Sequence, residues 1–395
     1  MNILDLIGRN EKLFFEDIFK HEKELSEIVK SSNFLVIGGA GSIGQAVTKE
    51  IFKRNPKKLH VVDISENNIV ELVRDIRSSF GYIKGDFQVF ALDVNSVEFD
   101  TYFEANTPFD YVLNLSALKH VRSEKDQYTL MRMFKVNILN TDKTIKQSIE
   151  KGVKKYFCVS TDKAANPANL MGASKRIMEM LLIQNSEKIK ISTARFANVA
   201  FSDGSLLHGF NQRIQKLQPI VAPNDVKRYF LTPQESGELC LMATIFGDNR
   251  DIFFPKLNEN LHQVSFSDIA VKYIISQGYE PQICSSEEEA RDLIKILPSQ
   301  GKWPCIFSKS DTTGEKDYEE FYTENEIIDL NKYKNLGIVK NSLNYDPLKI
   351  SFFQNSISEM QKSGVWTKDH LVNLCFYMIP DFKYIEKGKY LDSKM

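Results

Sequence analysis

The chain has 395 residues, 42% of them hydrophobic, which is enough for one large domain or two with a sizeable buried core. Its 51 basic and 52 acidic residues give a formal net charge of -1. This balance provides no positive field that would attract nucleic acid, so we expect no nucleic-acid partner.

Cysteine and histidine show no spacing typical of a metal site or a disulfide framework. The five cysteines and six histidines are scattered along the chain. We therefore expect reduced, buried thiols, no bound metal and a cytoplasmic location.

Residues 1–32 form a charged segment ahead of the first predicted strand. Its apolar residues, among them Leu13, Phe14 and Ile18, recur at helical spacing. We interpret this segment as an N-terminal helical extension laid on the domain, rather than as a signal peptide. The longest apolar stretches of the chain are far short of the ~20 residues that a membrane-spanning helix needs, so we expect no membrane span.

Between residues 33 and 200, short β-branched runs alternate with amphipathic segments, as in βα units around a parallel sheet. The predicted strands are 34–37, 59–62, 88–92, 111–115, 155–160 and 191–196. The predicted helices are 44–54, 68–79, a region around 131–152, and 171–185. Strands that are apolar throughout suit a sheet covered on both faces. The predicted fold class is therefore α/β, a Rossmann-type doubly wound parallel sheet with a smaller, mixed C-terminal lobe.

After residue 200 the rhythm loosens, because glycine, proline and polar residues interrupt it. We assign residues 201–380 to a substrate-binding lobe and C-terminal elements, some of which return to the sheet domain. The stretch 298–325 is predicted to be loop-rich and acidic. Residues 381–395 are predicted to form a polar tail, either an oligomer arm or a frayed end.

A glycine-rich turn stands at the end of the first predicted strand. Gly38, Gly41 and Gly44 lie in it, and Ser42 and Ile43 separate the last two. The first two glycines let the turn tighten and the backbone approach a pyrophosphate, while the third lets the following helix pack close to the strand. The N-terminus of that helix then faces the anion. Purely steric glycines are the alternative, but the place of the motif at the first strand favours a dinucleotide site.

Acidic residues follow the second and third predicted strands. Asp63 stands 25 residues after Gly38, where a carboxylate can accept hydrogen bonds from both ribose hydroxyls and repel a 2′-phosphate. This position predicts NAD rather than NADP as the cofactor. Asp93 and Val94 are placed to meet the adenine, and a helix N-cap is the competing role for Asp93.

The fifth predicted strand ends in Ser160, Thr161, Asp162 and Lys163. Ligands of open α/β sheets bind outside the carboxyl ends of the strands, so these side chains should face the site. A carboxyl and an amine at neighbouring positions can act as proton donor and acceptor on one substrate. A solvated surface ion pair is the alternative.

Two features resemble the extended branch of the short-chain dehydrogenase/reductase superfamily. The first is the G-x-x-G-x-x-G spacing at 38–44. The second is the helix after the fifth strand, where that branch has a Tyr four residues before a Lys and a Pro four residues before the Tyr. This chain keeps Pro167 and Lys175, but Met171 occupies the Tyr position. A thioether cannot move a proton, so the usual acid–base group of the superfamily is missing.

The segment 160–176 is similar to that of bacterial UDP-N-acetylglucosamine 4,6-dehydratases of the polysaccharide biosynthesis protein family, in the type that has Met for Tyr. These enzymes act in glycan pathways such as those to bacillosamine and legionaminic acid. Supporting blocks occur at 115–121, 136–141, 195–199, 202–205, 228–230 and 313–316. The resemblance spans about residues 30–330, and Asp203 stands where the family often has Arg. Many members carry an N-terminal membrane region, whereas this chain resembles a soluble form.

The resemblance implies a three-step reaction on a UDP-sugar. Hydride passes from C4 of the sugar to NAD, water is lost across C5 and C6, and the hydride returns to C6 to give a 4-keto-6-deoxy sugar. NAD is thus recycled and is expected to stay tightly bound. Lys163 is implied to be the base at C5, with a pKa lowered by burial beside the cationic nicotinamide or Lys175, and Asp162 is implied to be the acid at the C6 hydroxyl. The acceptor of the C4 proton stays open between Asp162 and a water relay through Thr161. Met171 and the Asn166-Pro167 stretch favour retention at C5.

The other roles implied by the resemblance concern binding. Thr161 should bond the C4 oxygen, and Lys175, helped by Asn137, the nicotinamide ribose. Further cofactor contacts are expected from Leu115, Ser116, Ala117, Lys119 and Ser160. Substrate contacts are expected from Lys119, His120, Thr161, Met171, Asn198, Ser205, Arg228 and Glu315. We expect a homodimer or higher homo-oligomer, formed by helices that flank the active-site helix.

Two other functions fit the same sequence. An epimerase or reductase of the superfamily would lose no water, and the adjacent Asp162 and Lys163 argue against it, because a simple epimerase needs no second acid–base pair. A non-catalytic protein that senses NAD is the other alternative, for which substitution of Lys163 would have no effect on binding.

Overall fold

The computed structural model describes residues 2–257, 261–310, 319–340, 345–386 and 388. Within these residues a nine-stranded sheet forms the centre, with the order β15-β16-β11-β6-β5-β4-β1-β2-β3. The parallel strands are β1 (Asn33–Ile37), β2 (Lys58–Asp63), β3 (Asp86–Ala91), β4 (Tyr111–Asn114), β5 (Lys155–Thr161), β6 (Lys190–Phe196) and β11 (Asp251–Pro255). β16 (Leu336–Lys340) pairs antiparallel with β11, and β15 (Ile327–Asp329) pairs antiparallel with β16.

The order of the parallel strands reverses at β1, which lies between β2 and β4. This reversal is the switch point of a doubly wound sheet, outside which ligands of such folds bind. Each of the six predicted strands overlaps an observed strand and differs from it by one or two residues at its ends. The predicted Rossmann-type α/β fold class is therefore confirmed.

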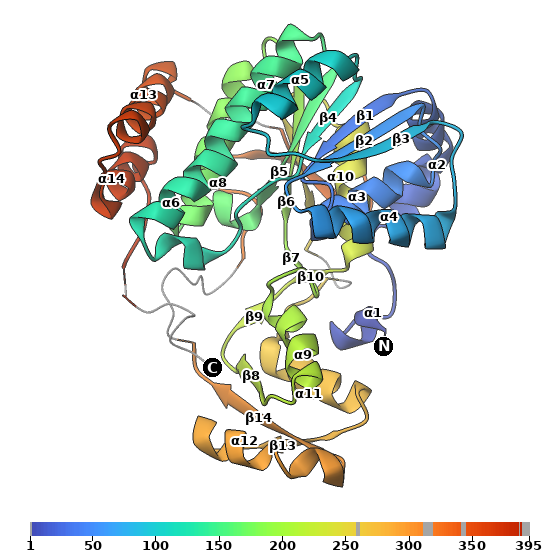
Figure 1. Ribbon diagram of the computed structural model, residues 1–395, viewed down its shortest axis with the longest axis vertical. Helices are drawn as coiled ribbons and strands as arrows, with labels where there is room; N and C mark the ends of the chain where they lie inside the picture. Colours follow the sequence, from blue (N-terminus) through green and yellow to red (C-terminus); the bar gives the residue numbers. More distant parts are fainter. Residues whose placement is uncertain (1, 258–260, 311–318, 341–344, 387, 389–395) are drawn as a thin grey trace.

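Helices cover both faces of this sheet (Figure 1). One face carries α2 (Phe15–Lys30), α3 (Ser42–Phe52), α4 (Glu66–Phe80) and α10 (Pro233–Phe246). The other carries α5 (Val97–Asn106), α6 (Gln127–Phe134), α7 (Asn140–Glu150) and α8 (Leu170–Asn185). Each layer has its own apolar cluster, so the strands between them are apolar on both sides, as predicted.

The helix predicted around 131–152 is interrupted. A π-helical turn, η2 (Lys135–Leu139), separates α6 from α7. Such π turns inside helices often occur at functional sites, because they redirect a side chain. Here the redirected residue is Asn137, which is buried.

Two C-terminal helices, α13 (Pro347–Ser363) and α14 (Lys368–Met378), pack beside α6 and α8 (Figure 1). They bury Phe353, Ile357 and Leu374 in the same apolar cluster as α8. In the predicted tail, Phe382 is also buried there, whereas residues 387 and 389–395 lie outside the described residues. These two helices thus cover part of the surface beside α8 for which we predicted contacts between subunits. A homo-oligomer stays a prediction.

A smaller lobe lies beyond the carboxyl ends of the parallel strands of the large sheet (Figure 1). It contains the parallel sheet β13-β14-β8, with two helices around one apolar cluster and a third helix in a separate small cluster. Its elements are α9 (Leu206–Gln215), β8 (Ile220–Pro223), α11 (Phe266–Ser276), β13 (Glu280–Ile283), α12 (Glu287–Leu293), η4 (Leu297–Gln300) and β14 (Lys302–Ser308). Short ladders join lobe and sheet, namely β7 (Asn198–Val199) with β10 (Phe230–Leu231), and β9 (Lys227–Arg228) with β12 (Val264–Ser265).

The N-terminal extension divides between the two parts of the molecule. The short helix α1 (Ile3–Leu6) packs on the lobe, whereas α2 covers the sheet. The predicted range 201–380 is likewise divided, because α10, β11, β15 and β16 return to the large sheet. Over the described residues, no helix combines the length and the apolar composition needed to cross a membrane.

The expectation of a loop-rich stretch at 298–325 is wrong for residues 302–308. These form β14, the central strand of the lobe sheet, and Trp303 and Cys305 are fully buried in it. Gly301 before the strand and Pro304 within it hide the strand from pattern analysis, because both residues are rare inside central strands.

Candidate active site

The predicted site residues lie on turns that follow β1, β2, β3, β4 and β5 at the carboxyl ends of these strands, on η2 and α8, and on short strands and loops toward the lobe (Figure 1). Hydrogen bonds join these two sets. Ser42 Oγ accepts from the backbone N–H of Asp203 at 2.8 Å, and Lys119 Nζ donates to Ser202 Oγ at 3.1 Å. The loop at 202–205 therefore closes on the glycine turn.

The three glycines of this turn differ in whether the fold itself leaves room for a side chain. Gly38 has a φ of +72°, and a Cβ there would lie 2.6 Å from the backbone nitrogen of Ser116. At Gly44 a Cβ would lie 2.1 Å from the carbonyl oxygen of Gly38. At Gly41 a Cβ would meet only that same oxygen, at 3.6 Å, and φ is -73°. The fold thus requires glycine at 38 and 44 but not at 41, where the absent side chain leaves the backbone open to a ligand.

Asp63 is fixed at the end of β2 beside this turn. Its Oδ2 accepts from the N–H of Ala40 at 3.0 Å and its Oδ1 from the N–H of Ser65 at 2.9 Å. Each carboxylate oxygen keeps a further lone pair, so both can still accept from a ligand hydroxyl. The arrangement fits the ribose-binding role predicted for Asp63.

Asp93 and Val94 lie in the turn between β3 and α5. Asp93 accepts from the N–H of Asn95 at 2.9 Å, and the N-cap of α5 is Ser96. The competing role of Asp93 as the cap of this helix is therefore wrong. Val94 is buried, and its carbonyl accepts from Lys143 Nζ.

Asn137 links the loop after β4 to helix α8. Its Oδ1 accepts from the N–H of Leu118 at 2.9 Å, and its Nδ2 donates to the carbonyl of Leu118 and to Ser174 Oγ. Earlier in the loop, the N–H of Leu115 donates to Ile37, and Ser116 Oγ donates to Asn114. Asn137 thus holds the 115–118 loop, which includes Ala117, against the helix that carries Lys175.

Asp162 and Lys163 are in direct contact in the short helix η3 (Asp162–Ala164). Lys163 Nζ lies 3.1 Å from Asp162 Oδ1 and 3.2 Å from Oδ2, and Thr161 Oγ1 donates to Oδ1 at 2.7 Å. The side chain of Asp162 is 2% exposed and that of Lys163 is 25% exposed. A fully solvated surface pair does not fit this burial, because the carboxylate is shielded and only the lysine keeps partial access to solvent.

The charges around Lys163 oppose the pKa that we expected. Burial alone would lower the pKa of Lys163, but the carboxylates of Asp162 and Glu319 outweigh it and raise the pKa. The guanidinium of Arg228 acts in the lowering direction. These protein groups therefore do not supply the lowered pKa that a base needs, and the lowering expected from the cationic nicotinamide stays a prediction.

Helix α8 brings Met171 and Lys175 to the site. Asn169 caps the helix by accepting from the N–H of Gly172 at 2.7 Å, and a Cβ at Gly172 would lie 2.5 Å from the carbonyl oxygen of Lys163. The missing side chain lets α8 pack directly on η3. Met171 is buried, and Lys175, also buried, donates to the carbonyl of Val159 at 3.1 Å. Burial lowers the pKa of Lys175.

Glu124, in the short helix η1 (Val121–Glu124), supports the same end of α8. Its Oε1 accepts from the N–H of Met171 at 2.8 Å, and its Oε2 has no hydrogen-bond partner among the described residues. Burial raises the pKa of Glu124 to about 7. Its carboxyl accepts a hydrogen bond from the first turn of α8 and thereby fixes the position of Met171.

A second buried carboxylate, Glu319, completes the charged group around Lys163. Its Oε1 accepts from Asn198 Nδ2 at 2.6 Å, and its Oε2 accepts from the backbone N–H of Tyr229 at 2.7 Å. Burial, followed by the charge of Asp162, raises the pKa of Glu319 to about 7. We did not predict a role for this residue and named Glu315 instead, which lies outside the described residues. The available signal was the Glu319-Glu320-Phe321 run, which is separated from the block at 313–316 by two residues.

The loop that carries Glu319 is fastened by a buried ion cluster. Arg195 uses all its N–H groups, with two bonds to Glu179, two to Glu326 and one to the carbonyl of Phe321, at 2.7–3.0 Å. Ser160 Oγ also donates to Glu179, at 2.6 Å. The hydroxyl predicted to meet the cofactor therefore has a partner in this cluster.

The structure shows the positions of several predicted substrate residues but does not bring all of them into contact. A Cβ at Gly204 would lie 2.7 Å from His120 Nε2, so the 202–205 loop rests on His120. Ser205 caps α9 by accepting from the N–H of His208. Arg228 is buried and donates to the carbonyl of Lys227 at 2.8 Å. The substrate roles of these residues stay predictions.

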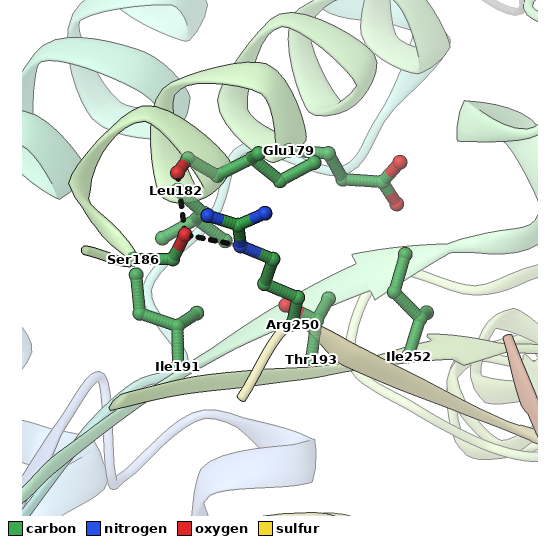
Figure 2. Close-up of a pocket in the computed structure, with 8 residues that line it drawn as sticks. Glu179, Leu182, Ser186, Ile191, Thr193, Arg250 and Ile252 are labelled. Atoms are coloured by element: carbon green, nitrogen blue, oxygen red, sulfur yellow. Dashed lines mark hydrogen bonds between the residues drawn. The ribbon is translucent and has the colours of Figure 1, made fainter. Parts of the chain in front are cut away.

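A small pocket lies at the opposite end of the sheet (Figure 2). It opens between α8 and the amino ends of β6 and β11, where Arg250 Nε donates to Ser186 Oγ at 2.6 Å. Its volume of about 10 Å³ leaves room for about one water molecule. The pocket is therefore too small for a sugar or a nucleotide.

The fold and the site together define an extended short-chain dehydrogenase/reductase. The chain belongs to the polysaccharide biosynthesis protein family, which it matches over residues 34–341. It is 32% identical to the uncharacterized membrane protein MJ1061 of Methanocaldococcus jannaschii, over 80% of this chain and 88% of that protein. It is 27% identical to the probable polysaccharide biosynthesis protein EpsC of Bacillus subtilis, of which it spans only 49%. The predicted family is confirmed.

Two relatives have named activities. A UDP-N-acetylglucosamine 4,6-dehydratase (inverting) of Campylobacter jejuni is 28% identical over 57% of this chain and 67% of that enzyme. A UDP-glucose 4-epimerase of Rickettsia bellii is 27% identical over 79% of this chain and 84% of that enzyme. The chain therefore lies within the nucleotide-sugar dehydratases and epimerases, and these matches alone do not separate the two activities.

Solved structures share the fold. Pen from Bacillus thuringiensis superposes with a TM-score of 0.64, at 23% identity, over 84% of this chain and 98% of that one. WbmF of Bordetella bronchiseptica, in complex with NAD+ and UDP, gives a TM-score of 0.52 at 18% identity, over 65% of this chain and 80% of that one.

Proposed function

We propose that this protein is a nucleotide-sugar 4,6-dehydratase, which converts UDP-N-acetylglucosamine to a UDP-4-keto-6-deoxy-N-acetylhexosamine for bacterial glycan biosynthesis. The observation that carries the proposal is the contact between the buried Asp162 carboxylate and the Lys163 amine at the end of β5. An amine and a carboxyl within reach of one substrate are what removal of water requires, because one group takes a proton and the other gives one. The Campylobacter dehydratase among the relatives supports the same activity.

We propose NAD as the cofactor, because the residues around the glycine turn fit it. Gly41 leaves the backbone open where a pyrophosphate would approach the N-terminus of α3, and Asp63 has free lone pairs for a ribose. The NAD+ bound to WbmF is consistent with this assignment. When bound, NAD supplies a hydride acceptor for C4 of the sugar and a hydride donor for C6.

The chain's own groups supply the proton transfers of the proposed reaction. The proton of the C4 hydroxyl passes to Asp162, directly or through a water relay at Thr161, when the hydride leaves C4. Neutral Lys163 then takes the proton from C5, and protonated Asp162 gives its proton to the departing C6 hydroxyl. Thr161 donates its hydroxyl proton to Asp162, so we assign its oxygen to accept a hydrogen bond from the C4 hydroxyl of the sugar. Retention at C5 stays our prediction, although the Campylobacter relative is named as inverting.

The diphosphate and uridine are assigned to the lobe side of the site. Arg228 is buried there, and its guanidinium suits phosphate. Asn198 and Ser205 complete the proposed set, and WbmF binds UDP in the same fold.

The first test is a reaction with UDP-N-acetylglucosamine in deuterated water. We expect a product lighter by one water than the substrate, with deuterium at C5, read by mass spectrometry and NMR. A UDP-sugar that keeps its full mass and changes configuration at C4 would instead establish an epimerase, as in the Rickettsia relative. Binding of NAD without turnover of any UDP-sugar would contradict both.

Exchange of single glycines by alanine tests the cofactor site. Gly41→Ala should fold normally but weaken NAD binding by about tenfold or more, because its methyl group occupies space that only a ligand needs. Gly44→Ala is the control, and it should destabilise the protein, because its Cβ has no room beside the carbonyl of Gly38. Calorimetry of NAD binding and thermal melting measure the two effects. Unchanged NAD affinity in Gly41→Ala would contradict the assignment.

A further inference from the structure

The loop at 202–205 is fastened to the lobe at both of its ends. Directly before it, Phe201 packs on the apolar cluster of the lobe, with its ring centroid 5.9 Å from that of Tyr273. At its other end, Ser205 is the N-cap of α9, a helix of the same cluster. The loop therefore belongs structurally to the lobe, although its middle reaches out to the large sheet.

The middle of this loop is bonded to two turns of the sheet domain. The backbone N–H of Asp203 donates to Ser42 Oγ at 2.8 Å, and Ser42 is the first residue of α3, directly after Gly41. The hydroxyl of Ser202, which is buried, accepts from Lys119 Nζ at 3.1 Å, and Lys119 lies in the loop after β4. Two hydrogen bonds thus connect the lobe to the turns that follow β1 and β4.

These are the two turns that a bound dinucleotide has to cross. Its adenine-side ribose fits Asp63 after β2, and its reactive end has to meet the sugar at Asp162 and Lys163 after β5. In the sheet, β4 and β1 lie between β5 and β2. A dinucleotide that extends from one position to the other therefore passes the carboxyl ends of β1 and β4, where the loop at 202–205 is attached.

We propose that the loop at 202–205 is a strap that closes over the bound dinucleotide, so that NAD enters and leaves only when the bonds to Ser42 and Lys119 are broken. The inference rests on the proposed function, in which the hydride taken from C4 of the sugar is needed again at C6. Loss of the cofactor between these steps would leave the sugar half-processed, and the strap prevents that loss. Both bonds join two protein groups, so they have to break for entry as well as for exit.

The test measures how fast NADH binds to and leaves the full-length protein, by stopped-flow fluorescence. Ser202→Ala removes the acceptor of Lys119 Nζ, and this hydroxyl has no assigned contact with a ligand. Ser42→Ala removes the acceptor at the other attachment. Each variant should raise both the association and the release rate by about fivefold, the factor that one hydrogen bond contributes. Because both rates rise together, the Kd of Ser202→Ala should change by less than about threefold.

The matched control is Ser286→Ala, which removes another lobe hydroxyl, the N-cap of α12, and should leave both rates as in the wild type. Wild-type rates in Ser202→Ala would overturn the proposal. So would a rise in the release rate alone, because the lost hydroxyl would then bind the cofactor instead of fastening the loop. If both rates rise as expected but the wild type removes no water from any UDP-sugar, the strap stands and the proposed dehydratase function fails.

Discussion

Lys163→Met is expected to lower the rate of water loss from UDP-N-acetylglucosamine by about a thousandfold, the range typical of a lost general base. Methionine keeps the length of the side chain but removes the amine that contacts both oxygens of Asp162. Oxidation at C4 does not need this amine in the proposed assignment. The variant should therefore still reduce its cofactor on addition of substrate, and the absorbance of the reduced form should persist.

Lys188→Met is the matched control, since Lys188 is exposed and lies after the far end of α8. It should turn over like the wild type. The decisive readout for both variants is deuterium at C5 of the product. Normal turnover with normal deuterium incorporation in Lys163→Met would remove Lys163 from the mechanism, and the assignment of the dehydratase reaction would lose its main support.

Arg195→Met is expected to lower the free energy of unfolding by about 3–5 kcal/mol, because it leaves buried carboxylates without their cation. The guanidinium makes two-pronged bonds to both Glu179 and Glu326, whose side chains are 1% and 7% exposed. Arg176 remains nearby but contacts each carboxylate only at 3.3–3.4 Å. Urea unfolding followed by circular dichroism measures the loss.

The control for this experiment is an arginine in an exposed ion pair. Arg291→Met breaks a pair with Glu287 whose side chains are 56% and 46% exposed, and it should change stability by less than about 1 kcal/mol. A loss equally small in Arg195→Met would contradict a structural role for the cluster. Burial would raise the pKa of Glu326, but Arg195 outweighs it and lowers that pKa. The contribution of Glu326 is thus present at neutral pH and is lost as the pH falls through its folded-state pKa.

Features that depend on neighbouring residues were accessible from the sequence. The six strands of the parallel sheet follow from apolar runs between turn residues, and the glycine turn follows from its spacing. The contact of Asp162 with Lys163 needed only their adjacency at a strand end. These predictions worked because strand periodicity and turn chemistry are local properties of the chain.

Features that depend on distant residues were not accessible. Nothing near Glu319 in the sequence indicates that it meets Asn198, and nothing near Ser160 indicates that its hydroxyl bonds Glu179 one helix later. The neighbouring Asp162 raises the pKa of Lys163, and Glu319, which the sequence did not bring near it, adds to this effect. Pairings of this kind are set by the packing of whole elements, which periodicity does not record.

The ion cluster around Arg195 has a consequence for how the molecule is assembled. Its bonds to Glu326 join residues 131 positions apart. These contacts of β6 can therefore form only after the ribosome has synthesised the whole lobe and the segment that follows it. A fragment that stops before Glu319 would bury a guanidinium that lacks the acceptors of three of its five hydrogen bonds. Such contacts across long separations slow folding, because the intervening chain must lose freedom before they form. We therefore expect such a fragment to leave the carboxyl end of β6 incompletely fixed.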